Sequence, residues 1–169
     1  MLKGSMVAII TPMQTDGTID KKAIPPLIEW HIANKTNAII VAGTTGESAT
    51  LDADEHFELI SLVVKQIAGR IPVIAGSGTN STQTTIKLSE QAKRAGADAC
   101  LIVTPYYNKP PQNGLYQHFK LIAETIDLPI ILYNVPQRTA CDILPDHTLS
   151  CAYQKYGLTI RAKDAYKRI

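Results

Sequence analysis

The sequence has few cysteines and no long apolar run, and both absences limit what the protein can be. Cys100, Cys141 and Cys151 are odd in number and show no CxxC spacing, so neither a disulfide framework nor a zinc site is expected. Cys100 is followed by apolar residues and is expected to be a small core residue. No apolar run approaches the roughly 18–20 residues that a membrane helix needs. The first ten residues lack the long apolar core and cleavage site of a signal peptide. We therefore expect a cytoplasmic protein with no membrane partner.

An excess of charge of one sign is also missing. The sequence has 17 lysines and arginines against 15 acidic residues, and a net charge of +2 does not favour binding to nucleic acid or to anionic membranes. The histidines, His31, His56, His118 and His147, show no metal-ligand spacing, so we expect them on the surface or on helix faces and expect no metal. With 45% hydrophobic residues, a chain of 169 residues can form one domain with its own core.

The sequence does contain a repeated order of apolar and amphipathic segments. Nearly all-apolar segments, typical of strands buried on both faces, are predicted at 6–10, 38–42, 72–75, 99–103 and 129–133. Helices are predicted between them, at 21–34, 53–68, 81–95 and 113–125, and those at 53–68 and 113–125 carry a stripe of apolar side chains on one face. This alternation indicates a parallel α/β architecture. Periodicity alone leaves open whether the strands form an open doubly wound sheet or part of a closed barrel.

Several of these strands end in polar residues that could carry chemistry: Thr44, Thr45, Tyr106, Tyr107, Tyr133 and Arg138. Barrel enzymes build their sites from the C-terminal ends of many strands, so this distribution favours the barrel. Threonine hydroxyls can cradle a carboxylate, phenols can pass a proton, and a guanidinium can grip a second carboxylate with two hydrogen bonds. Each residue also has a structural interpretation, because a tyrosine at a strand end is commonly an edge-of-core residue and a loop arginine is commonly solvated.

The turn after the second strand is rich in glycine. Gly43 and Gly46 are predicted to take backbone conformations that a Cβ would forbid, and to let a ligand approach the N–H groups of Thr44 and Thr45. Glu47 suits a hydrogen-bond partner of the site as readily as a catalytic base. Downstream, a helix start is expected where an aspartate is followed three positions later by a glutamate, at residues 52–55.

Three segments at the strand ends resemble the dihydrodipicolinate synthase (4-hydroxy-tetrahydrodipicolinate synthase) family. They are GTTGESATL at 43–51, VTPYYN at 103–108 and YNVPQRT at 133–139, and the resemblance extends over residues 1–146. Sister families of the same pyruvate-aldolase superfamily, such as the N-acetylneuraminate lyases, share the glycine turn and the YN-P turn. They usually lack the pair Arg138-Thr139, which favours the synthase over another 2-oxo-acid aldolase.

The resemblance implies a (β/α)8 TIM barrel and a class I aldolase without a cofactor. A lysine would form a Schiff base with pyruvate, and the resulting enamine would attack L-aspartate semialdehyde in the diaminopimelate route to lysine. The resemblance further implies that Thr44, Tyr107 and Tyr133 relay protons, that Thr45 holds the pyruvate carboxylate and that Arg138 holds the semialdehyde carboxylate. A homo-oligomer, either a tetramer or a dimer, is implied because the tyrosine matching Tyr107 reaches the site of a neighbouring subunit.

A lysine feedback site is also implied by the resemblance, at Ser48, Ala49, His56, Asn80 and Tyr106. The chain carries Ala53 and Thr84 where lysine-sensitive relatives tend to carry a histidine and a glutamate. The sequence therefore leaves feedback inhibition open.

Residues 147–169 depart from the family pattern. Lys163 is the only candidate for the Schiff-base lysine, but it lies 25 residues after Arg138, two more than in the family, and Arg161 stands where a small residue is expected. We therefore divide the chain into the N-terminal part of the barrel, 1–146, and a divergent tail, 147–169, interpreted as truncated or frame-disturbed. At most six strands are expected where a whole barrel has eight. The alternative to an enzyme is a non-catalytic fragment or pseudo-enzyme that keeps the binding groups without the nucleophile.

Overall fold

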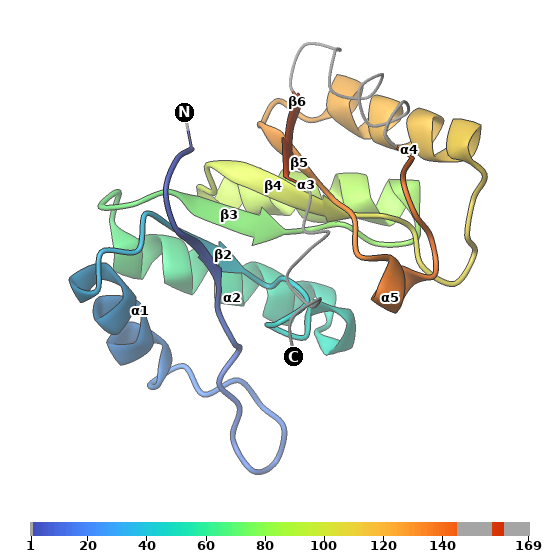
Figure 1. The fold of residues 1–169 in the computed structure, drawn as a ribbon. Coiled ribbons are helices and arrows are strands. Elements are labelled where there is room, and N and C mark those ends of the chain that lie inside the picture. The colour runs from blue at the N-terminus through green and yellow to red at the C-terminus, as the bar shows by residue number, and fades with distance from the viewer. Residues whose placement is uncertain (1, 145–156, 161–169) are drawn as a thin grey trace. The chain divides into compact units, whose positions relative to one another are not determined.

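The computed structural model describes residues 2–144 and 157–160, in which strands alternate with helices along the chain (Figure 1). The strands are β1 (Met6–Ala8), β2 (Ala38–Val41), β3 (Val73–Gly76), β4 (Ala99–Val103), β5 (Ile130–Tyr133) and β6 (Gly157–Ile160). The helices are α1 (Ile24–Ala33), η1 (Ser48–Thr50, a 3-10 turn), α2 (Ala53–Ile67), α3 (Thr82–Ala95), α4 (Gln112–Thr125) and α5 (Pro136–Thr139). None of these helices is long and apolar enough to cross a membrane.

The chain divides into two compact units. The first consists of Met1–Gly76 and Gln91–Ala99, and the second of Ser77–Glu90 and Cys100–Ile169. In the first unit β2 pairs in parallel with both β1 and β3. In the second unit β5 pairs in parallel with both β4 and β6. The parallel pairing confirms the α/β architecture predicted from the sequence.

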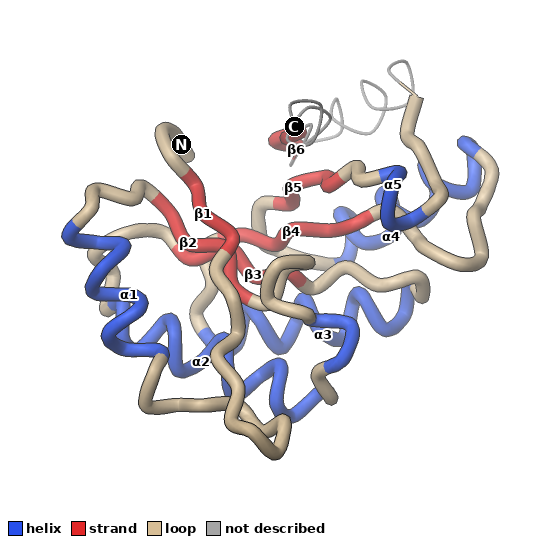
Figure 2. Tube along the Cα trace, turned by 60° about the horizontal axis from the view of Figure 1, so that its bottom comes forward, coloured by secondary structure: helices blue, strands red, loops and turns tan. Residues whose placement is uncertain are grey.

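The core of the first unit lies between its strands and two helices. Helix α2 packs against β2 and β3, and α1 packs against α2 (Figure 2). The side chains of Ile28, Ile39, Ile60, Val63 and Ile74 are completely buried. Because these side chains come from α1, α2, β2 and β3, they join both layers into one apolar core, and the predicted apolar stripe of α2 is confirmed.

Helix α2 begins and ends at residues whose chemistry suits those positions. Asp52 Oδ1 accepts hydrogen bonds from the N–H groups of Asp54 (2.9 Å) and Glu55 (2.8 Å), and Glu55 Oε2 accepts one from the Asp52 N–H (3.1 Å). This reciprocal pair satisfies N–H groups that the helix itself cannot pair, so the predicted helix start is confirmed. The chain then leaves the helix through Ala68 and Gly69, both at positive φ.

The second unit has a core of its own. Ile102, Ile122 and Ile131 are completely buried, and Leu115 and Phe119 of α4 are nearly so. These side chains come from β4, β5 and α4, which together enclose an apolar interior. The apolar face predicted for α4 is thereby confirmed.

The second unit also buries a small polar cluster. Ser77 Oγ and Ser89 Oγ lie 2.8 Å apart, and the completely buried Cys100 completes the group. Burial raises the pKa of the Cys100 thiol. Cys100 is therefore the small core residue expected from its apolar neighbours, and it is protonated at neutral pH.

The structure departs from the sequence-based elements mainly at their ends. Strand β1 stops at Ala8, two residues before the predicted end, and Ile10 is 55% exposed. Helix α1 starts at Ile24, which places Pro25 and Pro26 in its first turn, where proline's missing N–H costs nothing. The one-turn helix α5 has no counterpart among the predicted elements, because four residues carry no periodic signal.

Candidate active site

In the first unit, the connection between β2 and α2 carries the two candidate threonines. Thr44 is half-buried and Thr45 is exposed, directly beyond the C-terminal end of β2. The turn is closed by backbone hydrogen bonds from the Gly46 N–H to the Gly43 oxygen (3.1 Å) and from the Glu47 N–H to the Thr44 oxygen (3.2 Å). The hydroxyls of Thr44 and Thr45 are therefore presented on a fixed backbone.

The glycines of this turn serve close packing and not an unusual backbone angle. Neither Gly43 nor Gly46 has a positive φ, and the left-handed residues are Ala42 (φ 51°) and Glu47 (φ 54°), so the predicted conformational role is wrong. A Cβ on Gly46 would lie 3.1 Å from Thr11 Oγ1, and that hydroxyl donates a 2.7 Å hydrogen bond to the Gly46 oxygen. The loop after β1 therefore holds the turn after β2 in place.

His56 ties α2 to the C-terminal end of β3. Its ring is 2% exposed, and Nε2 lies 2.7 Å from the Gly76 oxygen, so this nitrogen carries the proton and donates. Burial lowers the pKa of His56, which keeps the ring neutral. His56 on α2 and His118 on α4 both lie on helix faces, one of the two placements expected for the histidines, and both are buried.

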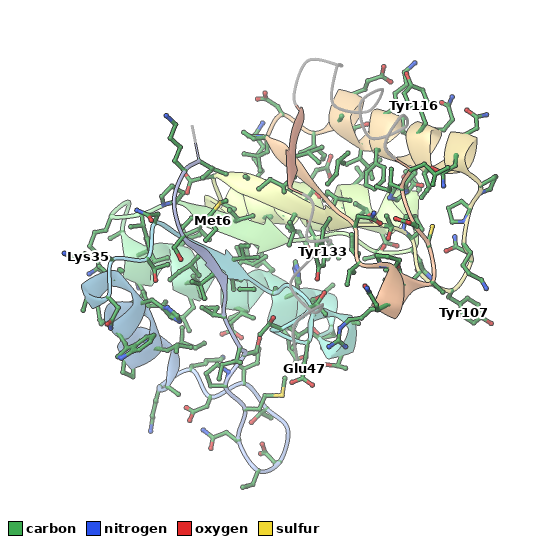
Figure 3. All side chains as sticks on the ribbon, in the orientation of Figure 1. Met6, Lys35, Glu47, Tyr107, Tyr116 and Tyr133 are labelled. Atoms are coloured by element: carbon green, nitrogen blue, oxygen red, sulfur yellow. The ribbon has the colours of Figure 1, made fainter. Side chains whose placement is uncertain are left out.

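In the second unit, the loops after β4 and β5 carry the other candidates. Tyr133 is the half-buried last residue of β5, and Arg138 is exposed on α5. Tyr107 is 88% exposed, sits at φ 71° and extends away from the ribbon (Figure 3). A bulky residue in the left-handed region is strained, and such strain clusters at functional sites.

The loop after β4 also contacts the segment before α3. Asn108 Nδ2 donates a 3.1 Å hydrogen bond to the Asn80 oxygen. The half-buried Tyr106 and the exposed Tyr107 directly precede Asn108, so the loop that carries them lies next to the loop that contains Asn80. Two of the residues implied in feedback, Asn80 and Tyr106, therefore lie in neighbouring loops of the second unit.

The candidate residues are thus divided between the units. The first unit contains Thr44, Thr45, Ser48, Ala49 and His56, all between β2 and the second turn of α2. The second unit contains Asn80, Tyr106, Tyr107, Tyr133 and Arg138. Lys163, the candidate Schiff-base lysine, lies outside the described residues.

Sequence reasoning did not predict that buried threonine hydroxyls support the turns of Thr44 and Arg138. Thr11 supports the turn of Thr44, and Thr104 and Thr139 support the turn of Arg138 through hydrogen bonds. A threonine directly after an apolar strand is a usable signal for Thr11 and Thr104, but their partners are 35 residues away in each case. Periodicity within one segment cannot identify such partners.

The two cysteines of the described region are poor nucleophiles. Cys100 and Cys141 are both buried and free. Burial raises the pKa of both thiols, and the neighbouring Asp142 raises that of Cys141 further. Since the thiolate is the reactive form, neither side chain suits covalent catalysis at neutral pH. The candidate residues of the described region therefore offer hydroxyls, phenols and a guanidinium, chemical groups that are able to bind carboxylates or move protons.

His118 on α4 is the most strongly perturbed histidine of the described region. Its Nδ1 lies 2.9 Å from Thr82 Oγ1, while its Nε2 is buried with no hydrogen-bond partner. Burial lowers the pKa of His118 to about 4, so the ring is neutral in the folded protein at neutral pH.

This burial predicts a loss of stability in mild acid. Because the folded-state pKa lies below the unfolded value near 6.5, the unfolded chain binds the extra proton, and stability falls as the pH drops from about 6.5 to about 4. We expect His118→Gln to remove about 3 kcal/mol of the difference in unfolding free energy between neutral pH and pH 4, measured by urea titration. His31→Gln is the control, because His31 also contacts a threonine hydroxyl (Thr36, 3.3 Å) but is only half-buried. An equal change in both variants would contradict the assignment.

Parallel βα units with hydroxyl, phenol and guanidinium groups after their strands are the arrangement found in TIM-barrel proteins, and this is the class that the fold and the candidate residues indicate. Residues 1–155 match the family model of the dihydrodipicolinate synthetase family. The chain belongs to this family. The fold expected from the sequence, about five to six units of a (β/α)8 barrel, is thereby confirmed.

Known proteins similar to the chain carry the same family name. The 4-hydroxy-tetrahydrodipicolinate synthases of Pseudomonas savastanoi pv. phaseolicola and Methylococcus capsulatus are each 60% identical, over 146 and 145 residues. Each match covers 86% of this chain and 50% of the relative, so the chain spans about half the length of these relatives.

Solved structures similar to the chain are also dihydrodipicolinate synthases. A dihydrodipicolinate synthase from Acinetobacter baumannii, complexed with pyruvate, matches with a TM-score of 0.95 and 50% identity over 96% of this chain and 56% of that one. The enzyme from Aquifex aeolicus matches with a TM-score of 0.89 and 49% identity, over 94% and 54%.

Proposed function

We propose that the chain carries the substrate-binding groups of a 4-hydroxy-tetrahydrodipicolinate synthase, a lyase that condenses pyruvate with L-aspartate semialdehyde. The observation that supports this most strongly is Arg138, whose exposed guanidinium lies on α5, shortly after β5. Hydrogen bonds from the buried Thr104 and Thr139 support this turn. A guanidinium in that position can bind the carboxylate of the aldehyde substrate with two parallel hydrogen bonds. Arg138 therefore favours a second substrate that carries a carboxylate, such as the semialdehyde, over a neutral sugar aldehyde.

The remaining groups fit a reaction that needs no bound cofactor. A lysine, for which Lys163 is the candidate, forms an iminium with pyruvate, and the iminium draws electrons so that a C3 proton can leave at neutral pH. Thr45 binds the pyruvate carboxylate in this proposal. Thr44, Tyr107 and Tyr133 pass the protons, because each offers a hydroxyl that both donates and accepts.

Assembly into a homo-oligomer is part of the proposal. The supporting observation is Tyr107, whose side chain is 88% exposed on a strained backbone and would act in the site of a neighbouring subunit. The product would enter the diaminopimelate route to lysine. The buried free cysteines Cys100 and Cys141 suit a reducing compartment, in agreement with a cytoplasmic location.

A regulatory lysine site remains a prediction for Ser48, Ala49, His56, Asn80 and Tyr106. Ala53 and Thr84 are both exposed and carry neither an imidazole nor a carboxylate. A bound lysine would find no charged partner for its ammonium groups at these two positions, so we favour weak feedback inhibition.

Reductive trapping tests the proposed function directly. Incubating the chain with pyruvate and borohydride should add one reduced pyruvate, because borohydride converts the iminium to a stable secondary amine. Intact mass and peptide mapping should place the adduct on Lys163, and Lys163→Arg should abolish it. Borohydride without pyruvate is the blank. No adduct, or adducts scattered over surface lysines, would contradict the proposal.

A further inference from the structure

The turn that carries Arg138 is too short to hold its own shape. Helix α5 has four residues, and no side chain caps its start. Its internal backbone hydrogen bonds run from the N–H groups of Arg138 (2.9 Å) and Thr139 (3.1 Å) to the Val135 oxygen, and from the Ala140 N–H to the Pro136 oxygen (2.9 Å). A single helical turn is unstable in water, since it fixes many dihedral angles for few hydrogen bonds. Its geometry must therefore be imposed by neighbouring groups.

The residue next to Arg138 supplies the first of these groups. Thr139 is 4% exposed, while Arg138 beside it is exposed. Thr139 Oγ1 donates to the Cys141 oxygen (2.9 Å) and accepts from the Cys141 N–H (3.3 Å). One hydroxyl thus fixes the chain where it leaves α5 through the left-handed Ala140.

A second buried hydroxyl connects this turn to both neighbouring strands. Thr104, directly after β4, is completely buried, and its Oγ1 donates to Thr139 Oγ1 at 3.1 Å. The Thr104 N–H donates to the oxygen of Tyr133, the last residue of β5, also at 3.1 Å. Thr104 therefore links the strand end that carries a candidate phenol to the turn that carries the candidate guanidinium.

The far end of the turn is held separately. Asn134 Nδ2 donates to Asp142 Oδ1 (2.6 Å), and Asn134 Oδ1 accepts from the Ile143 N–H (3.2 Å). Gln112 Nε2 donates to the backbone oxygen of Asp142 (2.7 Å), and Gln112 Oε1 accepts from the Leu144 N–H (3.1 Å). Because these contacts fix the ends of the loop independently of Thr139, removing one hydroxyl will loosen the turn without releasing the whole loop.

We propose that Thr139, held by Thr104, is the positioning residue that aims Arg138 at the carboxylate of the aldehyde substrate. This inference rests on the proposed function for the identity of that substrate. The hydroxyl pair would then govern how well the second substrate binds and leave the chemistry at pyruvate unaffected. A merely structural role would instead lower stability and leave the affinities for both substrates unchanged.

The first test needs no substrate. Thr139→Val and Thr104→Val keep the side-chain shape and remove the hydroxyl, and Thr139→Ser keeps the hydroxyl. We expect both valine variants to speed amide hydrogen exchange at Arg138 and Ala140 at least about tenfold, measured by NMR on the full chain, and Thr139→Ser to preserve the wild-type rates. Unchanged exchange in the valine variants would overturn the proposal.

The control for this test is Thr85→Val. Thr85 is also completely buried in the second unit, and its Oγ1 accepts a 2.9 Å hydrogen bond from the Thr79 N–H. The variant loses a comparable buried hydroxyl that bonds to Thr79 and belongs to α3. It should leave exchange at Arg138 and Ala140 unchanged, and faster exchange there in Thr85→Val would indicate general loosening and overturn the proposal.

The second test uses turnover. Thr139→Val should raise the KM for L-aspartate semialdehyde about tenfold, with the KM for pyruvate and the yield of the borohydride adduct unchanged, and Thr139→Ser should restore the wild-type KM. Equal changes in both KM values would overturn the proposal. If the wild-type chain gives neither turnover nor adduct, the proposed function fails, and the exchange rates alone then decide whether the hydroxyl pair holds the turn.

Discussion

Replacing Gly76 with alanine is expected to destabilise the first unit strongly. A Cβ at this position would lie 2.2 Å from the Ala42 oxygen and 2.8 Å from Gly43 Cα, and both are backbone atoms that cannot rotate away. Because Gly76 ends β3 and its oxygen is 2.7 Å from His56 Nε2, moving its backbone would also break that buried hydrogen bond. We expect a loss of about 3 kcal/mol or more in unfolding free energy, measured by urea titration.

Gly43→Ala is the matched control for this prediction. A Cβ on Gly43 would meet only Ile40 Cγ2, at 3.4 Å, which is an ordinary van der Waals contact. Gly43 also has no positive φ, so an alanine is not strained there. The control should cost less than about 1 kcal/mol. Equal destabilisation of the two variants would show that the close approach of the Ala42 oxygen is not what makes alanine unfavourable at Gly76, and would remove the specific role of Gly76.

The fold could be predicted from the sequence where the signal is local. The apolar segments predicted β2 to β5 to within one residue at each end, and the pair Asp52 and Glu55 marked the start of α2. Cys100 was placed correctly in the core because its neighbours in the strand are apolar. These signals depend only on a few residues next to each other in the chain.

The parts that could not be predicted depend on residues far apart in the sequence. Thr11 approaches Gly46 closely, which explains the glycine at this position. The positive φ values predicted for the glycines of this turn occur instead at Ala42 and Glu47. His56 and His118 are buried because other elements cover them, which a single polar residue on a helix does not reveal. The positions of the candidate groups were predicted as strand ends, but the buried hydroxyls that support them were not.

Replacing Arg138 with alanine is expected to cause the largest loss of activity among the described residues. Under the proposed function, the variant loses both hydrogen bonds to the semialdehyde carboxylate, and charge-assisted bonds of this kind are the strong ones. We expect kcat/KM for L-aspartate semialdehyde to fall about 100-fold or more, which corresponds to about 3 kcal/mol. Steady-state kinetics with pyruvate held constant would measure this.

Two comparisons make the effect of Arg138 specific. The borohydride adduct with pyruvate should form in Arg138→Ala as in the wild type, because the Schiff base precedes contact with the aldehyde. Arg70→Ala removes an exposed arginine that pairs with Glu29 at 2.6 Å ahead of β3, where an exposed ion pair contributes little, and it should leave kcat/KM unchanged. Loss of the adduct in Arg138→Ala would mean that the turn after β5 supports the pyruvate site as well. Arg138 would then act on both half-reactions, and the assignment of its guanidinium to the aldehyde carboxylate would be wrong.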